Sequence, residues 1–298
     1  MDTAHTDLPH TDLPLTPAAL TIEGGSLRCM FSAAVTDVLL ENHIHFAYVN
    51  GVSSGSMTAM NYVSRQNGRM LLTTKTYLHD KRYMGLRHLI KKRMIFNFDF
   101  SFGEMSSTLI PFDYDAFYSS PQRYEAVATR CKTGQPEYFE KGVCPDIINA
   151  IKASSSIPVL SRMIKVDHRQ YLDGGISMPI AYKRPMELGY GKVVLILTRD
   201  LTYRKKPMSP MMERAYRHYF APLPHLLDSL MEIPDRYNRM VEEIVRLESE
   251  GKIFVIRPEH PVTVSRMEQS IPKLEALYAE GRRVAEERLP ALRNYLEE

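Results

Sequence analysis

A serine flanked by glycines stands where a strand-like stretch gives way to a helical pattern. Residues 48–52 are typical of a β-strand, and Ser53 has Gly51 and Gly55 two places before and after it. In this context G-x-S-x-G predicts a nucleophile elbow, a sharp turn that exposes one hydroxyl at the end of a sheet. Ser54 lacks the flanking glycines, so Ser53 is the predicted nucleophile. Taken alone, the motif leaves a chance match open.

A glycine turn precedes this elbow. Gly24 and Gly25 follow the apolar residues 19–22, and helical periodicity comes next. A turn between a strand and a helix exposes backbone N–H groups beside the positive end of a helix dipole, and the oxyanion of acyl transfer needs such donors. A plain βα turn or a phosphate cradle is the alternative. The dinucleotide fingerprint G-x-G-x-x-G is not met, because Ser26 and Cys29 replace its second and third glycines.

A third motif lies much later in the chain. Asp173 ends a strand-like stretch and is followed by Gly174 and Gly175. In isolation, an aspartate before two glycines usually marks a turn and nothing more. The two earlier motifs weaken that interpretation.

Together the motifs resemble the patatin-like phospholipases, a family of serine acyl hydrolases, and are closest to its bacterial branch. The resemblance covers roughly residues 18–200. It rests on four segments in the family's order: 23–28, 51–55, 152–158 and 173–175.

The resemblance implies a catalytic dyad. Ser53 would attack the acyl carbonyl of a lipid ester, and Asp173 would accept the proton as general base and return it to the leaving alcohol. The implied oxyanion-hole residues belong to the glycine turn and the basic position after it: Gly24, Gly25, Ser26 and Arg28. Neither a cofactor nor a metal is implied.

The chain departs from the family pattern twice, because Ser26 replaces the third glycine and Cys29 the last one. A serine in left-handed geometry would cost about 1 kcal/mol or more. These departures keep open a non-catalytic acyl- or lipid-binding protein on the same fold.

A Ser–Asp–His triad of the α/β-hydrolase type is the other alternative. His218, His225 and His260 all follow Asp173, so the chain order permits it. Against it, only one helix separates the first two predicted strands, and Asp-Gly-Gly is the form that the dyad family uses.

The element order predicts the fold. Strands near 19–23 and 46–52 alternate with helices near 29–42 and 54–66. Such alternation predicts a three-layer α/β/α fold with a mostly parallel central sheet.

We expect three parts along the chain. They are a flexible tail at 1–17, a catalytic core at 18–200 and a mainly helical part at 201–298, the last two forming one domain. The helical part contributes one further strand at 252–257, two helices broken near Gly281, and a segment at 201–235 that is either a lid or an outer layer.

The composition is that of a soluble globular protein, with 44% hydrophobic and 24% charged residues among 298. A net charge of +3 is too small to indicate nucleic-acid binding. Three cysteines without C-x-x-C spacing predict free thiols rather than a disulfide framework or a zinc site. The start of the chain lacks the pattern of a signal peptide, and no apolar run approaches the roughly 18 residues of a membrane span. We therefore expect a cytoplasmic protein of undetermined oligomeric state.

Two segments after the second helix suggest contact with lipid. Basic and apolar residues interleave at 81–93, which is typical either of a helix lying on an anionic membrane surface or of a solvated helix face. Phenylalanines at every second position of 96–102 predict an extended segment with four rings on one face. Those rings would pack on the core, roof an acyl pocket, or do both.

Overall fold

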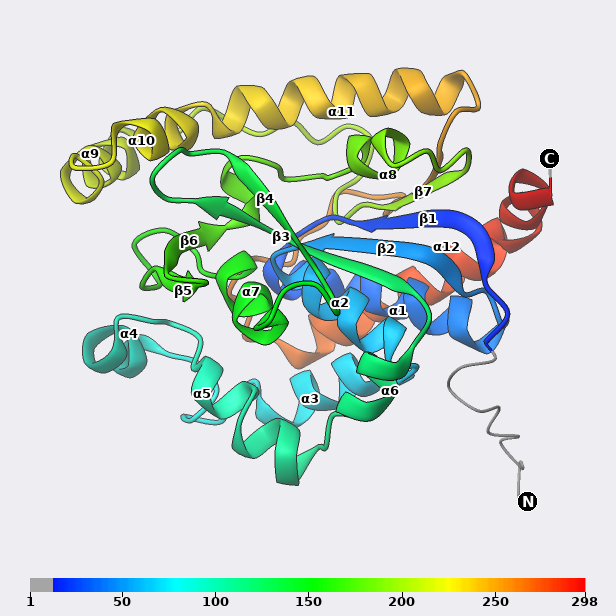
Figure 1. The fold of residues 1–298 in the computed structure, drawn as a ribbon, viewed down its shortest axis with the longest axis horizontal. Coiled ribbons are helices and arrows are strands. Elements are labelled where there is room, and N and C mark those ends of the chain that lie inside the picture. Colours follow the sequence, from blue (N-terminus) through cyan, green and yellow to red (C-terminus); the bar gives the residue numbers. More distant parts are fainter. Residues whose placement is uncertain (1–12, 298) are drawn as a thin grey trace.

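A central sheet organises the computed structural model, which describes residues 13–297 (Figure 1). The predicted tail falls largely on residues 1–12, outside the described part, and the first strand begins at Thr16. The described strands are β1 (Thr16–Ile22), β2 (Phe46–Val52), β3 (Arg123–Arg130), β4 (Pro136–Glu140), β5 (Ile164–Val166), β6 (Arg169–Asp173), β7 (Val193–Ile196) and β8 (Phe254–Ile256). Their order is β5-β6-β3-β2-β1-β7-β8, with β4 also paired to β3.

The centre of the sheet is parallel and one edge is antiparallel. Strands β3, β2, β1, β7 and β8 run in one direction, whereas β4 and β6 pair antiparallel with β3, and β5 antiparallel with β6. The prediction of a mostly parallel α/β sheet is confirmed.

Helices cover both faces of the sheet. Those of the first half are α1 (Cys29–Glu41), α2 (Ser54–Val63), α3 (Arg69–Tyr77), α4 (Leu86–Lys92), α5 (Phe98–Ser101) and α6 (Tyr114–Ser119). The later helices are α7 (Ile147–Ser154), α8 (Lys183–Glu187), α9 (Pro210–Tyr219), α10 (Pro224–Met231), α11 (Ile233–Ser249) and α12 (Ile271–Glu297). Single turns of other helix types occupy Ser26–Arg28, Met105–Leu109 and Gly174–Ile176.

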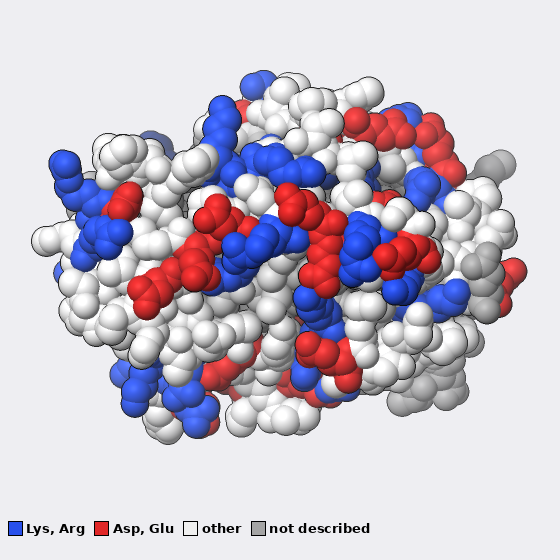
Figure 2. All heavy atoms as spheres, turned by 90° about the horizontal axis from the view of Figure 1, so that it is seen from above, with Lys and Arg blue, Asp and Glu red and all other residues white. Residues whose placement is uncertain are grey.

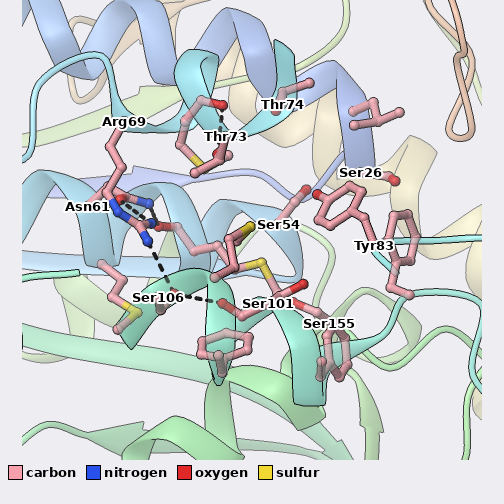
Figure 3. A pocket seen from close by; sticks show the side chains of 18 of the residues that line it. Ser26, Ser54, Asn61, Arg69, Thr73, Thr74, Tyr83, Ser101, Ser106 and Ser155 are labelled. Carbon is pink, nitrogen blue, oxygen red and sulfur yellow. Dashed lines mark hydrogen bonds between the residues drawn. The ribbon is translucent and has the colours of Figure 1, made fainter. Parts of the chain in front are cut away.

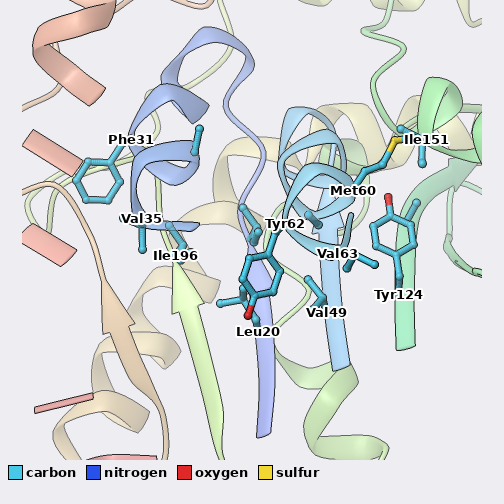
Figure 4. Close-up of a cluster of buried hydrophobic side chains, with 14 of the residues drawn as sticks. Leu20, Phe31, Val35, Val49, Met60, Tyr62, Val63, Tyr124, Ile151 and Ile196 are labelled. Atoms are coloured by element: carbon cyan, nitrogen blue, oxygen red, sulfur yellow. The ribbon is translucent and has the colours of Figure 1, made fainter. Parts of the chain in front are cut away.

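Alternate strand residues build the two layers, because successive side chains of a strand point to opposite faces. Leu20 and Val194 pack in the cluster shared with α1, α2 and α12, whereas Ala19 and Val193 pack beneath α11. Figure 4 shows the first cluster, with Leu20, Val49 and Ile196 of the sheet meeting side chains of α1 and α2. In Figure 1, α8 and α11 lie above the sheet and α1, α2 and α12 below it. The fold therefore has three layers.

The prediction of two C-terminal helices broken near Gly281 is wrong. One continuous helix, α12, passes through Gly281 and Pro290 and packs along α1. A Cβ on Gly281 would lie 2.6 Å from the carbonyl oxygen of Phe31 and 2.9 Å from the Cβ of Ala34. The glycine therefore permits close contact between two helices and does not end one.

The extended segment predicted for residues 96–102 is also wrong, because it contains the helix α5. Phe98 and Phe102, four residues apart, meet edge to face with ring centroids 6.1 Å apart. Phe100 turns away and packs edge to face on Tyr77 at 5.5 Å. Alternation over so short a stretch did not distinguish a strand from a buried helical turn.

The outer face formed by α9, α10 and α11 carries both charge signs side by side (Figure 2). Arg236 pairs with Glu232 at 2.7 Å, and Arg246 pairs with Glu250 at 2.6 Å, each pair spanning one helical turn. Such pairs are typical of a solvated helix surface.

Replacing Gly281 with alanine is expected to lower the free energy of unfolding by about 1–3 kcal/mol, because the new methyl group would clash with backbone of α1. At an exposed helix position the same change would stabilise the protein by about 1 kcal/mol. Ala279→Gly, at an exposed position of α12, measures that propensity effect alone. Urea denaturation of both variants is the measurement, and a gain in stability for Gly281→Ala would contradict the close packing.

Candidate active site

The strand β2 and the helix α2 meet in a sharp turn at Ser53. Its φ of 57° and ψ of −131° place a non-glycine residue in a strained region. The turn is possible because backbones approach closely around it. A Cβ on Gly51 would lie 2.4 Å from the oxygen of Gly55, and one on Gly55 would lie 2.5 Å from the oxygen of Ile22. Both motif glycines are thus required by close approach.

Ser53 and Asp173 meet across the sheet. The Oγ of Ser53 donates a hydrogen bond to Oδ2 of Asp173 at 2.7 Å. The N–H of Gly175 donates to the other carboxylate oxygen at 2.7 Å, which fixes the orientation of the carboxylate. Gly174 has no room for a side chain, since a Cβ there would lie 2.1 Å from the oxygen of Val127. The structure therefore brings the predicted nucleophile and base into direct contact.

Burial raises the pKa of Asp173 above the ordinary value of an aspartate, and the hydrogen bonds from Ser53 and Gly175 oppose that shift. A raised pKa makes the carboxylate a better proton acceptor than an exposed aspartate.

The serines at the C-terminal end of α7 and directly after it hold both partners of this pair. Ser154 Oγ accepts the N–H of Ser53 at 2.8 Å and donates to the oxygen of Val127 at 2.5 Å. The N–H of Asp173 donates to the oxygen of Ser156 at 2.9 Å. In the sequence this serine run served only as part of the family resemblance, and nothing there indicated that Ser154 would support the elbow.

The glycine turn after β1 lies against the elbow. A Cβ on Gly24 would lie 2.9 Å from the Cβ of Ser53, and the N–H of Gly25 donates to Ser54 Oγ at 3.1 Å. Ser26 has a φ of 54°, so the left-handed geometry considered for this position is the one present. Its hydroxyl donates to the carbonyl oxygen of Arg266 at 2.7 Å, which ties the turn to the segment before α12.

Cys29 is the first residue of α1 and contacts Ser54. Its Sγ lies 2.9 Å from Ser54 Oγ, and burial raises the pKa of the thiol to about 11. The thiol is therefore protonated at neutral pH and helps to hold Ser54. All three cysteines are free, as predicted.

Arg28 is a buried cation with an unusual environment. Its side chain is only 7% exposed, and its Nε is buried without a hydrogen-bond partner. Burial, then the charges of Arg199 and Arg266, lower its pKa to about 10. The nearby carboxylate of Glu23 is engaged elsewhere, since it accepts the N–H and the hydroxyl of Thr198 at 2.6 and 3.1 Å.

An apolar cavity of about 980 Å³, counting the space that opens to solvent, reaches Ser53. Nine methionine and phenylalanine side chains from α1, α2 and residues 70–112 line it: Met30, Met57, Met60, Met70, Met105, Phe96, Phe98, Phe102 and Phe112. Arg69 and Asn61 lie across this cavity from Ser26 and Ser54 (Figure 3). Three of the four phenylalanines at 96–102 thus line a pocket.

A second cavity, of about 790 Å³ on the same measure, adjoins Asp173 and the glycine turn. It shares only Ser26, Ser53 and Ile157 with the apolar cavity. Its other walls include Arg28 and residues between 173 and 266. The hydroxyl of Ser53 therefore stands where an apolar and a polar cavity meet.

The three histidines considered for a triad lie elsewhere. His218, His225 and His260 are exposed, and none of them lines either cavity. Within residues 13–297, no group of three or more His, Cys, Asp or Glu side chains could hold a metal ion.

Comparison with known families identifies this arrangement. The profile described as "Patatin-like phospholipase" matches residues 20–183, more than half of the chain. The chain belongs to the patatin-like phospholipase family. This match ends at residue 183, whereas several residues that line the polar cavity come later in the chain. A second profile, "Domain of unknown function (DUF6363)", matches residues 223–297 of this patatin-like protein.

The similarity of the chain to two individual proteins is low in sequence identity. The chain is 24% identical over 270 residues to "Uncharacterized protein YjjU" of Escherichia coli (strain K12), which spans 89% of this chain and 74% of that protein. It is also similar to the crystal structure of VipD from Legionella pneumophila, with a TM-score of 0.44 and 11% identity, covering 92% of this chain and 67% of that chain.

Ser26→Gly and Ser26→Ala form a matched pair, because both remove the hydroxyl that donates to Arg266. Only glycine adopts a positive φ freely, so we expect the glycine variant to be more stable than the alanine variant by about 1 kcal/mol. If the turn supplies an oxyanion donor at this position, as the sequence predicts, both variants should keep ester hydrolase activity, because neither change removes the backbone N–H. Thermal unfolding and an ester assay test this. An inactive but folded glycine variant would mean that the serine side chain itself takes part.

Proposed function

We propose that this patatin-like protein hydrolyses lipid carboxylic esters with Ser53 as nucleophile and Asp173 as general base. The observation that carries the proposal is the 2.7 Å hydrogen bond from Ser53 Oγ, which lines the apolar cavity, to Asp173 Oδ2. A nucleophile activated by an adjacent base is the arrangement that acyl transfer requires.

In the proposed reaction, the Ser53 oxygen attacks the acyl carbonyl carbon while its proton passes to Asp173. The bond from that carbon to the alcohol oxygen then breaks, and Asp173 returns the proton to the leaving alcohol. Water repeats the sequence on the acyl-enzyme, which releases the carboxylic acid and restores the serine.

Backbone N–H groups of the glycine turn would stabilise the oxyanion. The N–H of Gly25 is donated to Ser54 Oγ in this conformation. Gly24 and Ser26 are therefore the first candidates, and the Gly25 N–H would join them if it moved away from Ser54. Arg28 would add positive charge close to the developing oxyanion.

The acyl chain would occupy the apolar cavity. Five methionines line it together with phenylalanine rings, and methionine adapts to flexible apolar ligands. Burial of each methylene group contributes roughly 0.8 kcal/mol, which favours long acyl chains over acetyl groups.

We also propose that residues 81–93 contact a lipid surface. Arg87, Lys91 and Arg93 are exposed there, and Ile90 is 82% exposed between them. Tyr83 of the same segment lines the apolar cavity, so contact with a membrane would bring the cavity close to its lipid substrate. No helix in the described part of the chain is long and apolar enough to cross a membrane.

Ser53→Ala is expected to abolish ester hydrolysis and labelling by a fluorophosphonate probe, whereas Ser54→Ala retains a measurable fraction of both. Asp173→Asn should fold and lower kcat by at least ~10³-fold, the scale for loss of a general base. Mass spectrometry of the labelled protein identifies the modified residue.

The controls for this prediction are His218→Ala, His225→Ala and His260→Ala, which should remain active. A histidine variant as impaired as Asp173→Asn would favour the triad. Label on Ser54 or Ser155 would overturn the elbow assignment, and a folded wild type without any activity would favour the lipid-binding alternative.

The pH profile of kcat/KM should have an acid limb set by Asp173. The base must be ionised to accept a proton, and burial raises its pKa, so activity is lost as the pH falls through that raised value. We expect the midpoint above the ordinary aspartate value of about 3.9. Rates on an uncharged ester, with circular dichroism to monitor folding, measure it. A midpoint at or below the ordinary value would contradict the raised pKa.

A further inference from the structure

The apolar cavity that reaches Ser53 has a second polar end. Along α2 it is lined by Ser54, Met57, Met60 and Asn61, whose spacing of three and four residues places them on one face of the helix. Asn61 follows Ser53 by eight residues, which is about 12 Å of rise along an α-helix. Figure 3 shows Asn61 across the cavity from Ser54. Two methionines therefore separate a polar group near the nucleophile from another one farther along the helix.

Arg69 at this second end carries a positive charge that no carboxylate of the cavity offsets. None of the other described residues that line the cavity is an aspartate, glutamate, lysine, arginine or histidine. The ion pairs found in the described part of the chain do not include Arg69. Its guanidinium donates to four neutral acceptors: Asn61 Oδ1 at 3.3 Å, Ser106 Oγ at 3.1 Å, and the backbone oxygens of Ile110 at 2.8 Å and Pro111 at 3.4 Å. These bonds hold the group in place but do not neutralise it.

The surroundings of Arg69 favour an anionic partner. Burial lowers its pKa to about 10, so the guanidinium stays charged at neutral pH. Nη1 carries two N–H groups but makes one hydrogen bond within the described residues, to Asn61. The side chain is partly exposed, so an anion beside it would keep part of its own hydration. A terminal methyl group would displace water from the cation without replacing its hydrogen bonds, whereas a carboxylate would form a charge-assisted one.

We propose that this cavity accepts acyl chains that end in a carboxylate, so that the enzyme prefers half esters of dicarboxylic acids to esters of unsubstituted fatty acids of the same length. The inference rests on the proposed hydrolase function. The ester group would lie at Ser53, the methylene groups against the methionine and phenylalanine side chains, and the terminal carboxylate at Arg69. Each part of such a substrate then meets a wall of matching polarity.

The alternative is that Arg69 only holds residues 106–111 in place through its bonds to Ile110 and Pro111. The two roles differ in what they predict for substrates. A purely structural arginine is indifferent to the end of the acyl chain. A binding arginine responds to the terminal charge, and only when the chain is long enough to span the distance from Ser53.

Mono-4-nitrophenyl decanedioate and 4-nitrophenyl decanoate, both below their aggregation concentrations, provide the kinetic test. We expect kcat/KM to be at least about fivefold higher for the decanedioate, since a partly exposed ion pair contributes less than a buried one. The corresponding hexanedioate and hexanoate should show no such preference, because the shorter chain ends before it reaches Arg69.

Two variants identify the residue responsible. Arg69→Gln removes the charge but keeps N–H donors for the backbone oxygens of Ile110 and Pro111, and it should abolish the preference for the decanedioate. Lys75→Met removes an exposed cation of α3 that lines neither cavity, and this matched control should leave the preference unchanged. A preference that survives Arg69→Gln would overturn the proposal. If the glutamine variant does not fold, the length dependence in the wild type decides.

A binding measurement separates failure of the carboxylate subsite from failure of the hydrolase proposal. Calorimetry with Ser53→Ala protein should show tighter binding of monomethyl decanedioate than of dimethyl decanedioate, which lacks the free carboxylate. Arg69→Gln in that background should remove the difference. If wild type hydrolyses none of the nitrophenyl esters, the hydrolase proposal falls and the calorimetry still decides the subsite. Equal hydrolysis of the decanedioate and the decanoate, or equal binding of the two methyl esters, would overturn the subsite while leaving the hydrolase proposal intact.

Discussion

The contact between Ser53 and Asp173 depends on the register of three neighbouring strands. Gly51 of β2 pairs with Ala126 of β3, and Ala128 of β3 pairs with Asp173 of β6. A slip of one residue in either pairing would turn the affected side chains to the opposite face of the sheet. The 2.7 Å hydrogen bond joins residues 120 positions apart and therefore forms only in the observed register of the sheet. The core that holds the strands in register thereby also holds Ser53 and Asp173 in contact.

Backbone strain is concentrated at the same place. Ser53 and Ser26 both have positive φ values, 57° and 54°, and such geometry costs about 1–2 kcal/mol at a non-glycine residue. The surroundings hold each residue there, since Ser154 accepts the N–H of Ser53 and Arg266 accepts the hydroxyl of Ser26. Strain that persists under such constraints is typical of functional sites. It is consistent with a hydroxyl that must project from the sheet.

The sequence predicted what short motifs and local periodicity encode. Strand–turn–helix patterns around Gly24 and Ser53 were sufficient to place the glycine turn and the elbow, because the required glycines lie within a few residues of one another. Gly281 was misinterpreted as a helix break because the group that requires a glycine there, the carbonyl oxygen of Phe31, is distant in sequence. The sequence did not predict the polar cavity beside Asp173 for the same reason. Its cationic residues lie up to 238 positions apart, between Arg28 and Arg266, and no motif joins them.

Different parts of the chain line the two cavities that meet at Ser53. Ser53, Asp173 and the walls of the apolar cavity lie within the family match, whereas three cations that line the polar cavity follow residue 183: Arg199, Lys205 and Arg266. The hydrogen bond from the Ser26 hydroxyl to the backbone oxygen of Arg266 joins these parts at the glycine turn. The later part of the chain therefore helps to hold the positive-φ turn at Ser26, which lies beside Ser53.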